Sequence, residues 1–194
     1  MKVIEGIYLL LGSNLEDRDR NIQRARENIV QQVGSIVRTS GIYETEAWGV
    51  LDQPLFYNQV VQIETQLGHE ALLRALQKIE QEIGKIKVGK WRERLIDIDV
   101  LYYGNRIVRT PTLTVPHPEI QNRRFALAPL IELVPNELHP VLFQSHKNLL
   151  ETTQDTLEVW KVRRGKTEDG GRQTDSTFLN KINRFPFSVL RIPS

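Results

Sequence analysis

The chain has 194 residues, of which 40% are hydrophobic and 26% charged, a composition that suits one folded domain and excludes a disordered or fibrous protein. The net charge of +2 is small beside 26 basic and 24 acidic residues, so charge gives no reason to expect a nucleic acid or a membrane as a partner. Without cysteine the chain has no disulfide, zinc-thiolate site or cysteine nucleophile, which suits a reducing cytoplasm.

The N-terminal half of the chain alternates between strand-like and helix-like patterns. A continuous apolar run predicts a first strand, which ends at Gly12-Ser13-Asn14, where Ser13 or Asn14 can cap the next helix. Apolar residues at three- and four-residue spacing predict two helices, and Gly84 supplies the stop of the second. The predicted elements are a strand at 3–11, a helix at 15–33, strands at 36–43 and 56–65, a helix at 70–83 and a strand at 94–103.

This order of strand, helix, strand, strand, helix, strand predicts an α+β fold of the ferredoxin-like βαββαβ type. Such a unit forms a four-stranded antiparallel sheet with both helices on one face. We therefore expect the opposite face of the sheet to be free for ligands.

Further elements are predicted after this unit. Gly104-Asn105 predicts a hairpin into 106–108, and apolar spacing predicts helices over 125–133 and, more weakly, 142–160. The composition then becomes almost wholly polar. We expect one domain over 1–160 and a flexible C-terminal extension over 161–194.

The strand at 94–103 carries two carboxylates at a spacing that suits metal binding. Asp97 and Asp99 fall on one side of a period-two pattern, and Ile98, Val100 and Tyr102 fall on the other. Same-face neighbours in a strand lie about 6.5 to 7 Å apart, so both carboxylates can reach a common pair of hard cations. The alternative is a half-buried strand whose polar face meets water.

Residues near this strand offer groups for phosphate and for a heterocycle. Asn58 can present a donor and an acceptor to a heterocycle edge, and His117 is held between two prolines. Gly12-Ser13-Asn14 can present backbone amides to an anion, although a capping turn explains it equally well. Cations that suit a polyphosphate come just before the strand, at Lys85, Lys87, Lys90, Arg92 and Arg94.

Taken together, these short motifs resemble the 6-hydroxymethyl-7,8-dihydropterin pyrophosphokinases of folate biosynthesis. The similarity covers about residues 5 to 140, and the order and spacing of the motifs make it specific. The motifs are LLGSNL at 10–15, YET at 43–45, DQP at 52–54 with Asn58, IE at 79–80, RLIDID at 94–99, LTVPH at 113–117, NRRF at 122–125 and PL at 129–130.

The resemblance implies a reaction and a set of partners. A pyrophosphoryl group would pass from ATP to the 6-hydroxymethyl oxygen of the dihydropterin, and AMP would be released. Two Mg²⁺ ions would assist, since phosphoryl transfer needs charge neutralisation and in-line positioning. From the absence of cysteine and the small net charge we expect a cytoplasmic protein with neither a nucleic acid nor a membrane as a partner, and we expect a monomer.

The resemblance also implies a role for particular residues. Asp97 and Asp99 would be the Mg²⁺ ligands, and Arg94 and Lys85 would join them as catalytic residues. Thr45 and Asn58 would contact the pterin edge, Phe56 and Phe125 would stack on it with Trp48 nearby, and ATP would contact Gln77, Glu80, Lys87, Trp91, Ile98, Thr114, His117 and Arg123.

Two other functions are compatible with parts of the pattern. A paired carboxylate could serve another pyrophosphoryl or nucleotidyl transfer, because the pair does not fix which phosphate is attacked. A ferredoxin-like sheet could also bind RNA by stacking bases on aromatic side chains. The chain lacks an RNP1-like run, and the strand at 94–103 offers carboxylates, so the RNA-binding alternative has less support.

Overall fold

The computed structural model describes residues 2–47, 53–84 and 95–163. Cα positions group Met1–Lys161 into one compact unit and 162–194 into a second, of which only Val162 and Arg163 are described. The extension expected at 161–194 therefore lies almost wholly outside the described residues. The fold below is that of the first unit.

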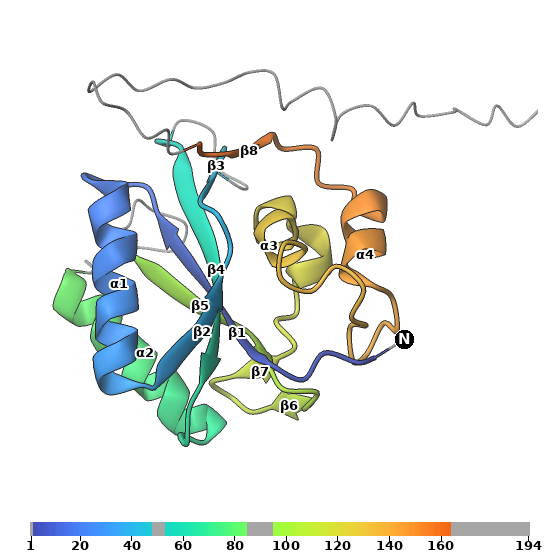
Figure 1. The fold of residues 1–194 in the computed structure, drawn as a ribbon, viewed down its shortest axis with the longest axis horizontal. Coiled ribbons are helices and arrows are strands. Elements are labelled where there is room, and N and C mark those ends of the chain that lie inside the picture. The colour runs from blue at the N-terminus through green and yellow to red at the C-terminus, as the bar shows by residue number, and fades with distance from the viewer. Residues whose placement is uncertain (1, 48–52, 85–94, 164–194) are drawn as a thin grey trace, which may run out of the picture. The chain divides into compact units, whose positions relative to one another are not determined.

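A six-stranded antiparallel sheet forms the centre of this unit, with the strand order β5-β1-β4-β3-β8 and with β2 also paired to β4 (Figure 1). The arrangement of β5, β1, β4 and β2 confirms the ferredoxin-like prediction. The elements are β1 (Ile7–Ser13), α1 (Arg18–Gln32), β2 (Ser35–Thr39), β3 (Tyr43–Thr45), β4 (Phe56–Glu64), α2 (His69–Ile83), β5 (Asp97–Tyr103), β6 (Val108–Arg109), β7 (Thr114–Val115), a 3₁₀ turn (Ile120–Asn122), α3 (Arg124–Leu130), α4 (His146–Thr152) and β8 (Val159–Lys161).

Helices α1 and α2 pack against each other on one face of the sheet, as predicted (Figure 1). Helix α2 ends where its sequence indicates, because Gly84 has a φ of 113°, a left-handed conformation that glycine adopts without a Cβ clash. Among the helices of the described ranges, none has the length and apolarity needed to cross a membrane.

Helix α1 begins later than its apolar spacing predicts. Strand β1 continues through Ser13, so neither Ser13 nor Asn14 caps the helix, and that prediction is wrong. Asp17 is the N-cap instead, and its side chain accepts a hydrogen bond from the Arg20 amide at 3.1 Å. The segment between Ser13 and Asp17 carries the chain from the sheet to the helix.

The single strand predicted over 36–43 is divided into β2 and β3, which pair with different parts of β4. The break lies at Ser40, whose backbone amide donates to the Val60 carbonyl while its hydroxyl accepts from the Val60 amide, both at 2.9 Å. The Gln59 side chain donates to the Ser40 carbonyl at 2.8 Å. The Ser40 hydroxyl thus takes the place of a backbone acceptor in the strand pairing, and the chain changes direction at this residue.

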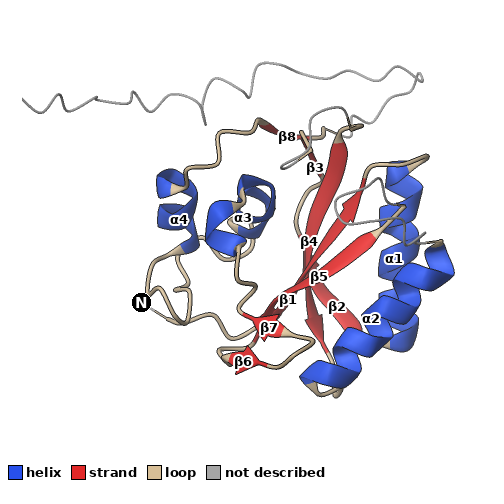
Figure 2. Ribbon diagram, turned by 180° about the vertical axis from the view of Figure 1, so that it is seen from behind, coloured by secondary structure: helices blue, strands red, loops and turns tan. Residues whose placement is uncertain are grey.

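A second core lies on the other face of the sheet, beneath helices α3 and α4 (Figures 1 and 2). The expectation that this face is free for ligands is therefore wrong where these helices cover it. Its buried members are Ile4, Tyr8, Leu10, Val60, Leu101, Tyr102, Ile120, Ala126, Leu127, Leu130, Val134 and Leu149.

Strand β5 contains an irregularity that redirects its side chains toward this second core. Tyr8 of β1 pairs with Tyr102, but the next residue, Leu9, pairs with Val100, so Leu101 is an extra residue in β5. An extra residue interrupts the alternation of faces. Tyr102 therefore lies on the α3 side with Tyr8, at 6.4 Å between ring centroids, and the prediction that it shares a face with Val100 is wrong.

The elements after β5 differ from their predictions because of pairing between distant segments. Gly104-Asn105 does form a turn, but β6 pairs with β7 rather than with β5, so the predicted hairpin is wrong. Of the helix predicted over 142–160, only His146–Thr152 is helical, so the prediction is wrong at 142–145 and beyond Thr152. Its last residues form β8, which adds to the edge of β3.

Two buried imidazoles surround Tyr102 in the second core. His146 has one ring nitrogen 3.0 Å from the Tyr102 hydroxyl and the other 2.9 Å from the Val134 carbonyl oxygen. His139 lies edge-on to the Tyr102 ring, with 5.6 Å between centroids. Burial lowers the pKa of both histidines from 6.5 to about 4, so both are neutral at pH 7.

We expect acid to weaken the fold through these imidazoles. In the unfolded chain a histidine takes up its proton near pH 6.5, whereas in the fold it does so only near pH 4, so acidification stabilises the unfolded state. The unfolding free energy should fall between pH 7 and pH 4 in both proteins. In the His146→Gln variant this fall should be smaller than in the wild type by up to roughly 3 kcal/mol, measured by urea denaturation. Thr152→Ala, an exposed change on the same helix, should keep the wild-type dependence, and parallel pH curves for wild type and His146→Gln would contradict the prediction.

Candidate active site

The candidate site begins with a row of residues across the sheet. Tyr43 of β3 pairs with Asn58 of β4, Asn58 pairs with Gly12 of β1, and Gly12 pairs with Asp97 of β5. Directly paired residues in antiparallel strands project from the same face. This row lies on the α3 side, one step beyond the core row that Val60 and Leu10 form, so the polar residues gather at one end of that face.

Gly12 lies in the middle of this row and has no side chain, so its backbone forms a floor between the side chains on either side. A Cβ atom at Gly12 would lie 3.4 Å from Oδ1 of Asn58, so its absence leaves open the space between Asn58 and Asp97. Glycine inside a strand often marks a place where a ligand approaches the backbone closely. The sequence suggested Gly12 as part of an anion-binding turn, whereas the structure places it inside β1.

Asn58 and Thr45 form a buried polar pair beside this floor. The Asn58 amide nitrogen donates to the Thr45 hydroxyl at 2.8 Å, and both residues are at least 97% buried, with exposures of 3% and 1%. The bond orients the Asn58 amide and leaves its Oδ1 as an acceptor and the Thr45 hydroxyl proton as a donor. An adjacent donor and acceptor suit the edge of a heterocycle, but the donor belongs to Thr45, whereas the sequence pattern assigned both groups to Asn58.

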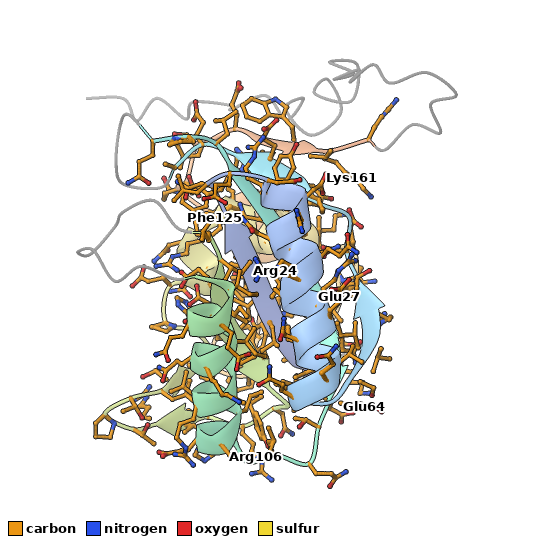
Figure 3. All side chains as sticks on the ribbon, turned by 90° about the vertical axis from the view of Figure 1, so that its left-hand side faces the viewer. Arg24, Glu27, Glu64, Arg106, Phe125 and Lys161 are labelled. Carbon is orange, nitrogen blue, oxygen red and sulfur yellow. The ribbon has the colours of Figure 1, made fainter. Side chains whose placement is uncertain are left out.

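Phe56 and Phe125 flank the polar pair. Phe56 pairs with Thr45 and so projects from the same face, and Phe125 belongs to α3, which covers that face. Figure 3 looks at the molecule from the α1 and α2 side, so Phe125 lies beyond the sheet there. The Arg123 guanidinium lies 5.7 Å from the centroid of the Phe125 ring. The structure thus brings the predicted pterin residues Thr45, Phe56, Asn58 and Phe125 to one face.

Asp97 and Asp99 also project from this face, because they pair with Gly12 and Leu10 of β1. Both are half-buried. Within the described ranges, no group of three or more His, Cys, Asp or Glu side chains could hold an ion by itself. Mg²⁺ is commonly held by one or two carboxylates together with substrate phosphates, so the pair fits such an ion.

His117 lies close enough to Asp97, one member of the acid pair, to respond to its charge. Its backbone amide donates to the Leu101 carbonyl of β5 at 2.9 Å, and its Nδ1 accepts from the Glu119 amide at 3.2 Å. Burial, together with Arg123, lowers the pKa of His117 from 6.5 to about 4, against the opposing effects of Glu119 and Asp97. The ring is therefore neutral at pH 7 and carries its proton on Nε2, where it can donate to an anion.

Other predicted nucleotide residues lie on or beside β5. Glu80 of α2 is buried, and its carboxylate accepts from the Ile98 amide at 2.8 Å, between the two aspartates. Ile98 pairs with Leu11, so its side chain projects toward α1 and α2, away from Asp97. Gln77 is exposed on α2 and Thr114 is exposed in β7. Their predicted contacts with ATP stay predictions.

The remaining predicted site residues lie outside the described residues. They are Trp48, Lys85, Lys87, Trp91 and Arg94.

The site therefore joins a carboxylate pair to an open floor with a polar edge and aromatic neighbours, which suits metal-assisted group transfer to a flat heterocycle. The family model for 7,8-dihydro-6-hydroxymethylpterin-pyrophosphokinase (HPPK) matches residues 8–135. The chain belongs to this family, whose members transfer pyrophosphate to hydroxymethyldihydropterin in folate synthesis.

Relatives include two bacterial proteins named 2-amino-4-hydroxy-6-hydroxymethyldihydropteridine pyrophosphokinase. The Aquifex aeolicus protein is 41% identical over 135 residues, which cover 70% of this chain and 84% of the relative. The Bacillus subtilis protein is 35% identical over 162 residues, covering 83% of this chain and 93% of the relative. The Folic acid synthesis protein fol1 of Pneumocystis carinii is 38% identical over 151 residues, but the chain spans only 20% of its length.

Solved structures of similar fold contain HPPK-DHPS chains. One, in complex with substrates, has a TM-score of 0.60 and 15% identity and covers 76% of this chain and 43% of that one. Another, from Plasmodium falciparum with pteroate, has a TM-score of 0.62 and 17% identity and covers 78% and 42%. At this identity the likeness concerns the fold, and it agrees with the antiparallel sheet and helices described above.

We expect the His117 ring to remain neutral across the physiological range. Its burial and the neighbouring Arg123 disfavour the imidazolium, so its ring resonances should show no inflection between pH 8 and pH 5.5 in NMR spectra. The signal is assigned by its loss in the His117→Gln variant. An inflection near pH 6.5 would contradict this prediction.

Proposed function

We propose that this chain transfers the terminal pyrophosphoryl group of ATP to 6-hydroxymethyl-7,8-dihydropterin, with Asp97 and Asp99 as ligands of two Mg²⁺ ions. In this reaction the hydroxymethyl oxygen forms a bond to the β-phosphorus of ATP. The bond between that phosphorus and the oxygen bridging to the α-phosphate breaks, so AMP leaves and the hydroxyl proton is released. The main support is the row in which the Asn58 amide, the Gly12 floor and the Asp97 carboxylate follow one another on one face.

The polar pair and the phenyl rings would bind the pterin. Oδ1 of Asn58 would accept from the pterin edge and the Thr45 hydroxyl would donate to it, while Phe56 and Phe125 stack on the ring faces. Trp48 would complete the pocket, as the family resemblance implies. A ring held at Asn58 over Gly12 extends toward Asp97, which directs its hydroxymethyl group to the acid pair.

The other predicted residues would bind ATP. When bound, Mg²⁺ neutralises the phosphate charge and aligns the reacting oxygens. The neutral His117 ring would donate its Nε2 proton to a phosphate oxygen, and the Arg123 guanidinium would add positive charge next to it. Lys85, Lys87, Trp91 and Arg94 would act with them, and Gln77, Glu80, Ile98 and Thr114 would contact the nucleotide.

We also propose that the catalytic domain ends with β8, at Lys161 rather than at Trp160. Lys161 pairs with Tyr43 in the sheet, and its ammonium group lies 2.7 Å from the Glu132 carboxylate. These contacts support assigning Lys161 to the domain. Residues beyond it would be dispensable for the reaction, and the enzyme would act as a cytoplasmic monomer.

The reaction is tested by incubating the purified chain with magnesium, ATP and the dihydropterin alcohol. We expect AMP and the pterin diphosphate in equal amounts, because the pyrophosphoryl group moves as a unit. Release of ADP or of free pyrophosphate would contradict the proposal and would favour another phosphoryl or nucleotidyl transfer.

In the same assay, Asp97→Asn and Asp99→Asn should each reduce turnover by at least about a hundredfold without unfolding the protein, because each removes an anionic ligand from the proposed metal pair. Glu151→Gln removes an exposed carboxylate on α4 and should keep wild-type turnover. Wild-type turnover in either aspartate variant at ordinary magnesium would exclude the two-ion assignment.

The Gly12→Ala variant tests the floor of the site. Its methyl group would occupy the space beside Asn58 that the pterin needs, while strand β1 accepts alanine with little strain. We expect the dissociation constant for the pterin to rise about tenfold or more, measured by calorimetry, and the melting temperature to change little. Gly68→Ala, at a position with open space around it, is the matched control and should bind the pterin normally. Equal pterin affinity in the two variants would argue against the proposed floor.

A further inference from the structure

We infer that Arg18 is a positioning residue for the pterin side of the site, acting from the opposite face of the sheet. This inference rests on the proposed function, because it concerns the pocket that Thr45, Phe56 and Asn58 would form. Arg18 stands in the first turn of α1 and belongs to none of the motifs by which the sequence resembles its family.

A second row of residues lies directly behind the pocket. Glu44 pairs with Tyr57, and Tyr57 pairs with Ser13, so these three side chains share one face. Each is the chain neighbour of a residue on the pocket side, because alternate residues of a strand project from opposite faces. Glu44 adjoins Thr45, and Tyr57 lies between Phe56 and Asn58. A displacement of a residue in this second row therefore also moves the adjacent residue of the chain, which lies on the pocket side.

The Arg18 guanidinium contacts two members of this second row and, as a third partner, the residue that precedes β4. Its Nη1 donates to the Leu55 carbonyl oxygen at 2.7 Å and lies 2.9 Å from the Glu44 carboxylate. Its central carbon is 3.8 Å from the centroid of the Tyr57 ring. One side chain thus joins β3, β4 and the residue that precedes β4. The planar guanidinium can stack and donate to two acceptors at the same time, which a lysine ammonium cannot do.

This ion pair is better shielded than a surface pair. The Arg18 and Glu44 side chains are only 21% and 20% exposed, whereas the ion pairs Glu70–Arg74 and Lys78–Glu82 on α2 and Lys147–Glu151 on α4 join side chains that are at least 40% exposed. Screening by water and salt is correspondingly weaker. The contact is therefore expected to hold β3 and β4 at a fixed separation.

Hydrogen bonds hold the start of helix α1 against the sheet, so the backbone of Arg18 has a fixed position. The Asn21 amide nitrogen donates to the Leu15 carbonyl at 3.0 Å and to the Ser13 hydroxyl of β1 at 3.3 Å. Asn21 is buried, and Asp17 caps the helix immediately before Arg18. The first turns of α1 therefore span the back of the sheet from β1 to β3.

Loss of Arg18 should let β3 move relative to β4. Strand β3 has only three residues, and its Thr45 is the partner of Asn58 in the 2.8 Å bond that orients the pterin-binding amide. A small displacement would weaken that bond and the match to the pterin edge. The acid pair lies on β5, on the far side of β1, so the ATP side of the site should be little affected.

The test compares Arg18→Gln and Arg18→Lys with Arg24→Gln, an exposed arginine farther along the same helix (Figure 3). For Arg18→Gln we expect KM for the pterin to rise at least tenfold, with KM for ATP and kcat within threefold of wild type. Arg18→Lys should recover only part of the loss, and Arg24→Gln should match the wild type. Equal behaviour of Arg18→Gln and Arg24→Gln, or a fall in kcat with unchanged pterin KM, would overturn the inference.

A second readout separates this inference from the proposed reaction. Without any substrate, the side-chain amide of Asn58 should shift in the NMR spectrum of Arg18→Gln and not in that of Arg24→Gln, because its bond to Thr45 is altered. An unchanged Asn58 signal would overturn the positioning role even if the enzyme is active. Absence of AMP formation by the wild type would instead overturn the proposed function.

Glu44→Gln provides an independent variant if Arg18→Gln does not fold. It keeps an acceptor for the Arg18 guanidinium but removes the charge, so the pterin KM should rise severalfold in the same direction. Unchanged pterin KM in Glu44→Gln would count against the ion pair as the positioning contact.

Discussion

The pairing register of β1 with its two neighbours is the constraint on which the rest of the structure depends. Strand β1 lies between β4 and β5, and its alternation decides which residues of all three strands face α1 and α2 and which face α3. A slip of β1 by one residue against both neighbours would turn its own side chains to the other face. Leu11 or Ser13 would then stand between Asn58 and Asp97 in place of Gly12, and Leu10 would leave the second core, so packing of the apolar faces fixes the chemistry of the polar end.

The extra residue in β5 lets one strand serve two environments. Before Leu101 the strand places carboxylates at the polar end of the α3 face, and after it the strand buries Tyr102 in the second core of the same face. Regular alternation would have sent Tyr102 toward α1 and α2. The second core also contains His139 and His146, which burial keeps neutral, and Nδ1 of His139 accepts hydrogen bonds from the Val141 and Leu142 amides, which only the neutral ring can do.

Local patterns sufficed to predict the elements that depend on neighbouring residues. Helix α2 with its Gly84 stop, the strand with Asp97 and Asp99, and the ferredoxin-like order all follow from periodicity. The split at Ser40, the extra Leu101 and strand β8 depend on partners far away in the sequence, which periodicity does not detect. In the site, the acids and Asn58 are visible as residue types, whereas the role of Gly12 requires the register, and the individual ligand roles came from family resemblance.

Strand β8 has a consequence for how the protein is made. It covers the outer edge of β3, and Glu132 reinforces the closure by accepting hydrogen bonds from the Tyr43 hydroxyl and the Gly41 amide while pairing with Lys161. Because Lys161 is synthesised long after Tyr43, the nascent sheet has an uncovered edge until translation has passed this point. An uncovered edge is a template for pairing with other chains. Ribosomes that stop before β8 would therefore release a product prone to aggregation, although every residue of the polar row is already present in it.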